Sequence, residues 1–187
     1  MKTTSLVIIL FGLVLAVFPG LAPVYGQNTR SAPIDVNLII DSSEAFSDVA
    51  GEVSGWVSQR LVDQIMVTGD RITVWSAGEA AKIIYSESIK NDTDKENVKR
   101  ALRGLSLSGA GADFSGALKD AASRTPSSGI VYTLLISSSA AALTPTLLGP
   151  QANLMRVSRV EEFHGWLALV IGLNLDSKIK QAAAAFM

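Results

Sequence analysis

The sequence has no cysteine and only one histidine, His164. Without cysteine the chain forms no disulfide bond, offers no thiolate to a metal and has no cysteine nucleophile. One histidine is too few for a histidine-rich zinc site, and a Ser-His-Asp triad would have to use His164. Charge is also nearly balanced, since 16 Lys+Arg and 17 Asp+Glu leave a formal net charge of −1 at pH 7. We expect no nucleic-acid partner, because no basic field attracts phosphates.

Signatures of the common enzyme classes are missing as well. The glycine-rich segment 109–116 lacks the Gly-Lys-Ser/Thr ending with which a phosphate-binding loop contacts phosphate and Mg²⁺. No Gly-x-Ser-x-Gly nucleophile elbow occurs in the chain. The segment 41–43, Asp-Ser-Ser, lacks the second carboxylate that a phosphatase of the haloacid dehalogenase type would need. We therefore predict no catalytic residues.

The strongest hydrophobic run lies at the start of the chain. Lys2 precedes the apolar segment 5–18, and Pro19-Gly20 and the small-residue pattern 24–26 follow it. A basic start, a short apolar run and a cleavage-like end are typical of a signal peptide, and a membrane span needs about 20 apolar residues. We predict a signal peptide over 1–26 and a short linker over 27–32. The mature domain would be soluble and periplasmic or secreted, with membrane contact only if the leader is kept as an anchor.

The remaining residues, 33–187, alternate between short β-rich runs and amphipathic helical patterns. This order predicts one α/β domain with a doubly wound, mainly parallel sheet, one antiparallel edge strand joined across residues 77–79, and helices on both faces. The predicted strands are 34–40, 71–76, 81–86, 130–136 and 166–172. The predicted helices are 44–66, 93–105, 114–122, 151–163 and 176–186.

Sites in doubly wound sheets form at the carboxyl ends of the strands, where the winding reverses. Three polar or glycine-rich segments follow predicted strands or precede a predicted helix: 41–43, 109–113 and 137–139. We expect them to meet at one edge of the sheet. Asp41 and Asp113 each stand just before a helical pattern, so each has a helix-capping role as an alternative to ligand binding.

Several segments resemble motifs of the von Willebrand factor A domain family. Residues 39–45, Ile-Ile-Asp-Ser-Ser-Glu-Ala, are similar to its Asp-x-Ser-x-Ser motif, and residues 111–118 are similar to its Gly-Gly-Thr-Asp-x-x-x-Ala-Leu segment. Residues 134–139 stand where the family has a strand followed by Thr-Asp-Gly, and residues 168–173 resemble its next strand. The resemblance covers most of 33–187. It implies a Rossmann-like, three-layer α/β/α fold and a role in binding proteins.

The family's metal-ion-dependent adhesion site holds a divalent cation with five side chains, and only part of that set is present here. Asp41 and Ser43 match, whereas Ala45, Ala112 and Ser138 stand at the other three positions. Alanine supplies no oxygen, and a hard ion such as Mg²⁺ needs about six. The resemblance therefore implies a degenerate metal site at Asp41 and Ser43, no required cofactor, and at most weak binding of Mg²⁺ or Mn²⁺.

The sequence predicts an exported, non-enzymatic protein-interaction module with an unidentified protein partner. Two alternatives stay open: a divalent-cation-dependent adhesin with an unconventional coordination shell, and a structural subunit of a larger cell-envelope complex. The second alternative arises because family domains usually continue into one more strand and helix, so an uncovered sheet edge could pair with another chain or a second copy. The predicted partner-binding face consists of Ser42, Ser43, Ala112, Asp113 and Ser138.

Overall fold

A computed structural model describes residue 30 and residues 32–140, 142–143 and 157–173. The predicted signal peptide (1–26), most of the linker (27–32) and the predicted C-terminal helix (176–186) lie outside the described residues. Within the described part of the chain, no helix is both long enough and apolar enough to cross a membrane.

The strands and helices follow the hydrophobic patterns of the sequence. The long predicted helix over 44–66 is confirmed as a 3-10 turn (Glu44–Phe46), helix α2 (Ser47–Trp56) and a π-helical continuation (Val57–Ile65). Two further helices are α3 (Asp92–Arg103) and α4 (Phe114–Ser123). The strands are β1 (Asp35–Asp41), β2 (Arg71–Ala77), β3 (Ala81–Ser88), β4 (Val131–Ser137), β5 (Val157–Phe163) and β6 (Trp166–Leu173).

The six strands form one sheet in the order β3-β2-β1-β4-β6-β5. Strand β1 lies inside the sheet and pairs in parallel with β2 on one side and β4 on the other. Strand β3 is antiparallel to β2, as the predicted edge hairpin requires. Because β6 is antiparallel to both β4 and β5, four strands run in one direction and two in the other.

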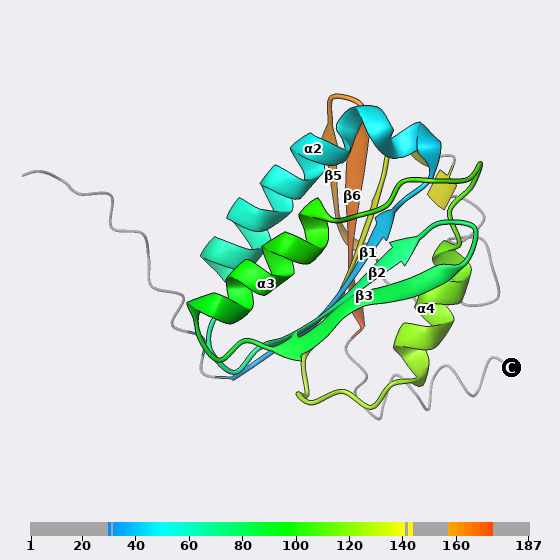
Figure 1. Cartoon of the computed structure of the whole chain (residues 1–187). Helices are drawn as coiled ribbons and strands as arrows, with labels where there is room; N and C mark the ends of the chain where they lie inside the picture. Colours follow the sequence, from blue (N-terminus) through cyan, green and yellow to red (C-terminus); the bar gives the residue numbers. More distant parts are fainter. Residues whose placement is uncertain (1–29, 31, 141, 144–156, 174–187) are drawn as a thin grey trace, which may run out of the picture.

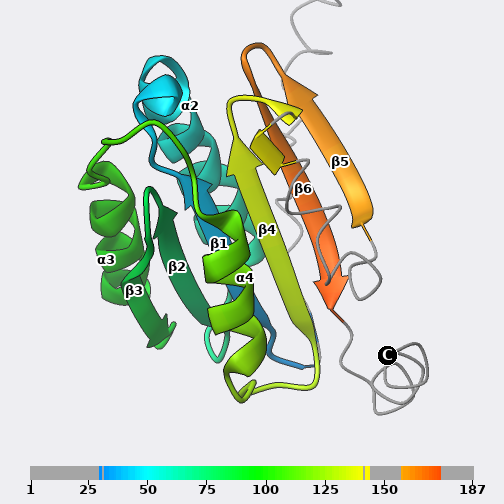
Figure 2. The ribbon, with the colours of Figure 1, turned by 90° about the vertical axis from the view of Figure 1, so that its right-hand side faces the viewer.

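Helices cover both faces of the sheet and give an α/β fold of three layers. Helices α2 and α3 lie along one face and α4 on the other (Figures 1 and 2). The core consists of two apolar clusters, and alternate residues of β1 supply both: Leu38 and Ile40 join the α2 and α3 side, whereas Ile39 joins the α4 side. This alternation explains why β1 is apolar almost throughout, since both of its faces are buried.

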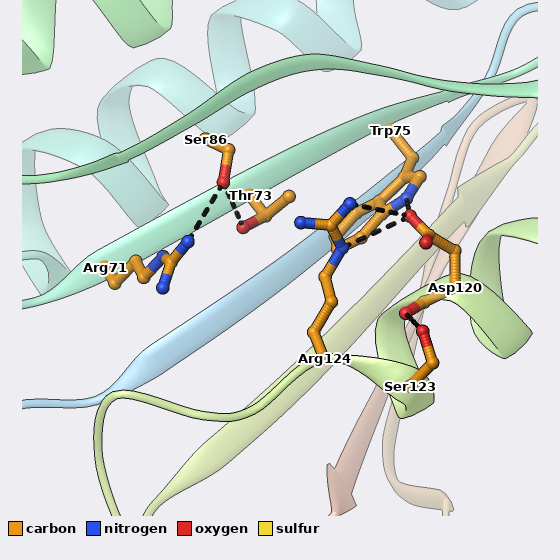
Figure 3. Close-up of polar contacts among 7 residues, drawn as sticks. All are labelled: Arg71, Thr73, Trp75, Ser86, Asp120, Ser123 and Arg124. Carbon is orange, nitrogen blue, oxygen red and sulfur yellow. Dashed lines mark hydrogen bonds and ion pairs between the residues drawn. The ribbon is translucent and has the colours of Figure 1, made fainter.

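A polar contact fixes α4 against strand β2. The indole nitrogen of Trp75 donates a hydrogen bond to Asp120 Oδ2 at 2.9 Å, and Arg124 binds the same carboxylate oxygen (Figure 3). The Arg124 guanidinium also lies 5.8 Å from the Trp75 ring centroid, within the range of a cation–π contact. Helix α4 is thereby held near the carboxyl end of β2.

The structure corrects the prediction for the last part of the sheet. The predicted helix over 151–163 is wrong in its described residues, because Val157–Phe163 is strand β5. Phe163 pairs with Trp166 across His164-Gly165, and Gly165 has φ +88°, so the two strands form a tight hairpin that needs glycine. In consequence the following strand, β6, enters the sheet antiparallel to β4 and not parallel to it.

Candidate functional site

Asp41 is the last residue of β1 and the centre of a buried hydrogen-bond cluster. Its carboxylate is nearly covered, with the residue 2% exposed. Oδ1 accepts hydrogen bonds from the backbone N–H of Ser43 at 2.8 Å and from the Ser43 hydroxyl at 2.7 Å. Oδ2 accepts a third bond from the hydroxyl of Ser137 at 2.8 Å. Three donors therefore take up both carboxylate oxygens.

The residue that reaches Asp41 from β4 is Ser137, whereas Ser138 was the residue predicted for the site. The resemblance had aligned Ser138 with the family's aspartate, but Ser138 follows the end of β4, and Ser137 carries the contact. The register of β1 and β4 in the structure explains this contact. Ile40 pairs with Ile136, so the next residue of each strand, Asp41 and Ser137, lie side by side. The cluster thus joins β1 to β4, where the winding of the sheet reverses.

Ser42 and Ser43 lie beneath the surface. Their residues are 2% and 4% exposed. The Ser42 hydroxyl accepts a hydrogen bond from the Ser76 hydroxyl at 2.7 Å, and the Ser43 hydroxyl donates to Asp41. Both side chains lie below the surface of the described chain, and their part in a partner-binding face stays a prediction. They shape the loops from below and leave other residues at the surface.

The segment 109–113 meets the end of β1, as predicted. The N–H of Glu44 donates to the carbonyl of Gly109 at 3.0 Å, and the N–H of Asp113 donates to the carbonyl of Gly78 at 2.8 Å. Gly109 has φ +84°, a backbone conformation that favours glycine, and a β-carbon there would also displace the exposed side chain of Glu79, whose Cγ would lie 2.6 Å away. Three loops from distant parts of the sequence therefore form one surface.

Asp113 caps helix α4, which was the alternative to a binding role. Its Oδ1 accepts a hydrogen bond from the N–H of Gly116 at 2.8 Å, and its side chain also accepts from the N–H of Ala81 at 3.4 Å. Ala112, just before it, is partly buried against the apolar cluster under α4. Both residues lie at the predicted site, and both have structural contacts there.

The donor set of this site does not fit the cation of a metal-ion-dependent adhesion site. Around Asp41 the described side chains bring one carboxylate and the hydroxyls of Ser43 and Ser137, while Ala45 and Ala112 bring no oxygen. These groups supply three side-chain positions, whereas a divalent ion of this kind takes about six oxygens, so water or backbone carbonyls would have to supply the rest. Among the described residues no group of three or more histidine, aspartate or glutamate side chains could hold a metal ion.

The outer surface above the cluster carries small or neutral side chains with few charges. Glu44, Ala45, Ala110, Gly111 and Ser139 are exposed there. His164 is exposed in the turn between β5 and β6, and within the described part of the chain no hydrogen bond joins it to Asp41 or to the serines. Among the described residues, His164 and the serines around Asp41 therefore do not form a hydrogen-bonded nucleophile–base pair.

Comparisons with known proteins give only distant likenesses. No family model matches the chain, and no curated protein matches it. The solved structures that resemble it include proximal thread matrix protein 1 from the mussel byssus, at 16% identity and a TM-score of 0.43, covering 50% of this chain and 26% of that one.

Two further solved structures come from the type V pili tip protein Mfa5 of Porphyromonas gingivalis. Its three N-terminal domains match at 21% identity and a TM-score of 0.42, covering 56% of this chain and 19% of that one. Its vWF domain alone matches at 24% identity and a TM-score of 0.41, covering 55% of this chain and 36% of that one. The chain thus spans about a fifth to a third of the length of these structures. Because these TM-scores are low, the fold assignment rests on the strands and helices of the chain itself.

Proposed function

We propose that this chain is an exported, non-enzymatic interaction module that resembles a von Willebrand factor A domain and binds a protein partner without a bridging cation. The observation that carries the proposal is the state of Asp41. Three donors, two from Ser43 and one from Ser137 at the end of β4, bind both oxygens of a carboxylate whose residue is 2% exposed. A group in this state holds loops in place, and contact with a partner falls to the exposed residues above it.

The proposed partner surface is the rim formed by three loops. Two of them follow β1 and β4, and the third is segment 109–113, which meets the end of β1. Its members are exposed or half-buried and come from segments that Asp41 and the backbone bonds of Gly109 and Gly78 hold together. Loops positioned by a rigid sheet are a common place for binding residues. The rim residues are Glu44, Ala45, Ala110, Gly111, Ser138 and Ser139.

Metal independence is tested by unfolding the full chain in chelator and in about 5 mM Mg²⁺ or Mn²⁺. A ligand at about 100 times its Kd would add about 2.7 kcal/mol to the free energy of unfolding. We expect no such increase. An increase that is present in the wild type and in Asp35→Asn, but absent in Asp41→Asn, would support the cation-dependent adhesin instead. Asp35→Asn is the matched control because Asp35 is a buried aspartate at the other end of the same strand.

The position of the interface is tested by photo-crosslinking in the cells that produce the chain. A photo-reactive residue at Ser139, which is exposed on the rim, should form a covalent adduct with another protein. The same residue at Lys119, which is exposed on α4, serves as the control. Adducts of the same protein and yield at both positions, or at Lys119 alone, would place the interface elsewhere.

A further inference from the structure

Strand β3 is an edge of the sheet, and its outer side presents backbone groups to the surroundings. Among the described residues β3 pairs with β2 alone, and no further backbone–backbone hydrogen bond joins its residues to the rest of the chain; the N–H of Ala81, at its start, donates to the Asp113 side chain. Figure 1 shows β3 on the outer side of β2. An edge of this kind can add a further strand through its free N–H and C=O groups.

An irregularity in β3 brings two opposite charges to the same face. Val74 pairs with Tyr85, whereas the next residue, Trp75, pairs with Ile83, so that Ile84 is an extra residue in β3. In a regular strand, residues 82 and 87 would project from opposite faces, because five positions separate them. The extra residue, Ile84, shifts the alternation by one position, so the side chains of residues 82 and 87 project from the same face.

The pairing with β2 places both charges on the face that α2 and α3 cover. Lys82 lies opposite Ser76 and Glu87 lies opposite Ile72, and Ile72 belongs to the apolar cluster of that face. Both charged side chains are exposed, and neither has an ion-pair partner among the described residues. Lys82 and Glu87 therefore flank the centre of the edge as an unpaired cation and an unpaired anion.

We propose that β3 pairs with β3 of a second copy of this chain, antiparallel and about a two-fold axis. In this arrangement Lys82 of each copy lies opposite Glu87 of the other, and Ile84 lies opposite Tyr85. The two ion pairs form together because the arrangement is symmetric. Lysine on an edge strand ordinarily discourages pairing, but here it selects the one register in which a glutamate faces it.

The surroundings of Glu87 leave room for the incoming lysine. Glu87 lines an open cavity of about 540 Å³ beside α3, together with Tyr85, Lys90, Asp94 and Arg100. Burial, and then the carboxylates of Asp94 and Glu87, raise the pKa of the Tyr85 phenol, which places Glu87 close to this ring. The charges of the lining balance, since Glu87 and Asp94 stand beside Lys90 and Arg100, so the attraction for a lysine of the second copy comes from pairing with Glu87 itself.

The opposite face of β3 is already occupied by contacts within the chain. The Ser86 hydroxyl bonds Thr73 at 3.0 Å and accepts from Arg71 at 3.5 Å (Figure 3). In the proposed dimer Ile83 of one copy faces Ser86 of the other on this side. The charge selection therefore acts on the α3 side alone.

Charge reversal in the full chain, followed by sedimentation equilibrium, tests the proposal. We expect the wild type to dimerise reversibly. Lys82→Glu and Glu87→Lys should each raise the dimer dissociation constant by about tenfold or more, because each puts like charges opposite one another. Lys119→Glu, an exposed charge reversal on α4, should leave it unchanged.

Mixing the two single variants gives the decisive result. The edge strand of Lys82→Glu carries a carboxylate at both positions, and that of Glu87→Lys carries an ammonium group at both. Both ion pairs therefore return when one variant faces the other, and the mixture should form a heterodimer about as tight as the wild-type dimer. Misfolded variants could not restore each other in this way.

Two results would overturn the proposal: a monomeric wild type, or a wild-type dimer that is indifferent to both charge reversals. The loop rim lies at the carboxyl ends of β1 and β4, and neither variant changes a residue there. Binding at the rim is therefore tested separately, and failure of the dimer leaves the proposed function standing.

Discussion

Strand β1 begins and ends on a buried aspartate, and serines bind both. At its amino end, Asp35 accepts bonds from the backbone N–H and hydroxyl of Ser127 and from the N–H of Ser128. At its carboxyl end, Asp41 accepts bonds from Ser43 and Ser137. Only Asp41 lies in a motif that suggests a metal ligand. Because the two clusters are alike, an aspartate at the end of β1 can have the purely structural role of holding a loop in place.

The two clusters differ in their donors and in their exposure. Two of the three donors at Asp35 are backbone N–H groups, whereas two of the three at Asp41 are hydroxyls, which can rotate and offer a lone pair. Ser127 is exposed, whereas Ser43 and Ser137 are buried. Loss of the carboxylate should therefore harm the Asp41 end more, since water cannot replace it there.

The largest effect is predicted for removing the carboxylates of Asp41 and Asp35 one at a time. Asp41→Ala should lower the free energy of unfolding by about 4 kcal/mol, because the buried N–H of Ser43 loses its acceptor and the buried hydroxyls of Ser43 and Ser137 lose their partner. Asp35→Ala should cost about 2 kcal/mol, because water reaches the exposed loop of Ser127. Urea unfolding of the full chain followed by circular dichroism measures both.

The matched asparagine variants show whether charge or geometry matters. Asp41→Asn keeps an acceptor of the same shape for Ser43 and should recover part of the loss seen in Asp41→Ala. Equal costs for Asp35→Ala and Asp41→Ala would contradict the difference in exposure. A cost below about 1 kcal/mol at Asp41 would contradict its role as an anchor.

A smaller effect separates neighbouring serines at the end of β4. Ser137→Ala removes one donor to Asp41 and should cost about 1–2 kcal/mol, since a hydrogen bond to a charged group is lost. Ser138→Ala removes a half-exposed hydroxyl outside this cluster and should stay within about 0.5 kcal/mol. The same unfolding measurement compares them, and the reverse order would restore Ser138 as the residue that faces Asp41.

Much of the fold could be predicted because burial repeats with the period of each element. The apolar run of β1 and the three- and four-residue spacing over 44–65 indicated a buried strand and a long helix, and both are present. The meeting of segment 109–113 with the end of β1 followed from the rule that sites lie at the carboxyl ends of strands.

The errors arose where local pattern and tertiary pairing disagree. Residues 157–163 contain charges that suit a helix face, and only pairing with β6 makes them a strand. The choice between Ser137 and Ser138 depends on register with β1, which a single strand does not reveal. The burial of Ser42 and Ser43 depends on Ser76 and Ser137, far away in the sequence.

The smallest predicted effect tests whether the half-buried Asp113 also holds its loop in place. A β-carbon at Gly116 would lie 2.1 Å from Asp113 Oδ2, whereas one at Gly51 in α2 has open space. Gly51→Ala should stabilise the chain by about 0.8 kcal/mol through helix propensity. Gly116→Ala should bring no such gain, because moving the Asp113 carboxylate costs about 1 kcal/mol of capping. In an Asp113→Ala background nothing is left to displace, so Gly116→Ala should then match Gly51→Ala. A gain at Gly116 in the wild-type background as large as that at Gly51 would show that Asp113, unlike Asp41, is dispensable to its loop.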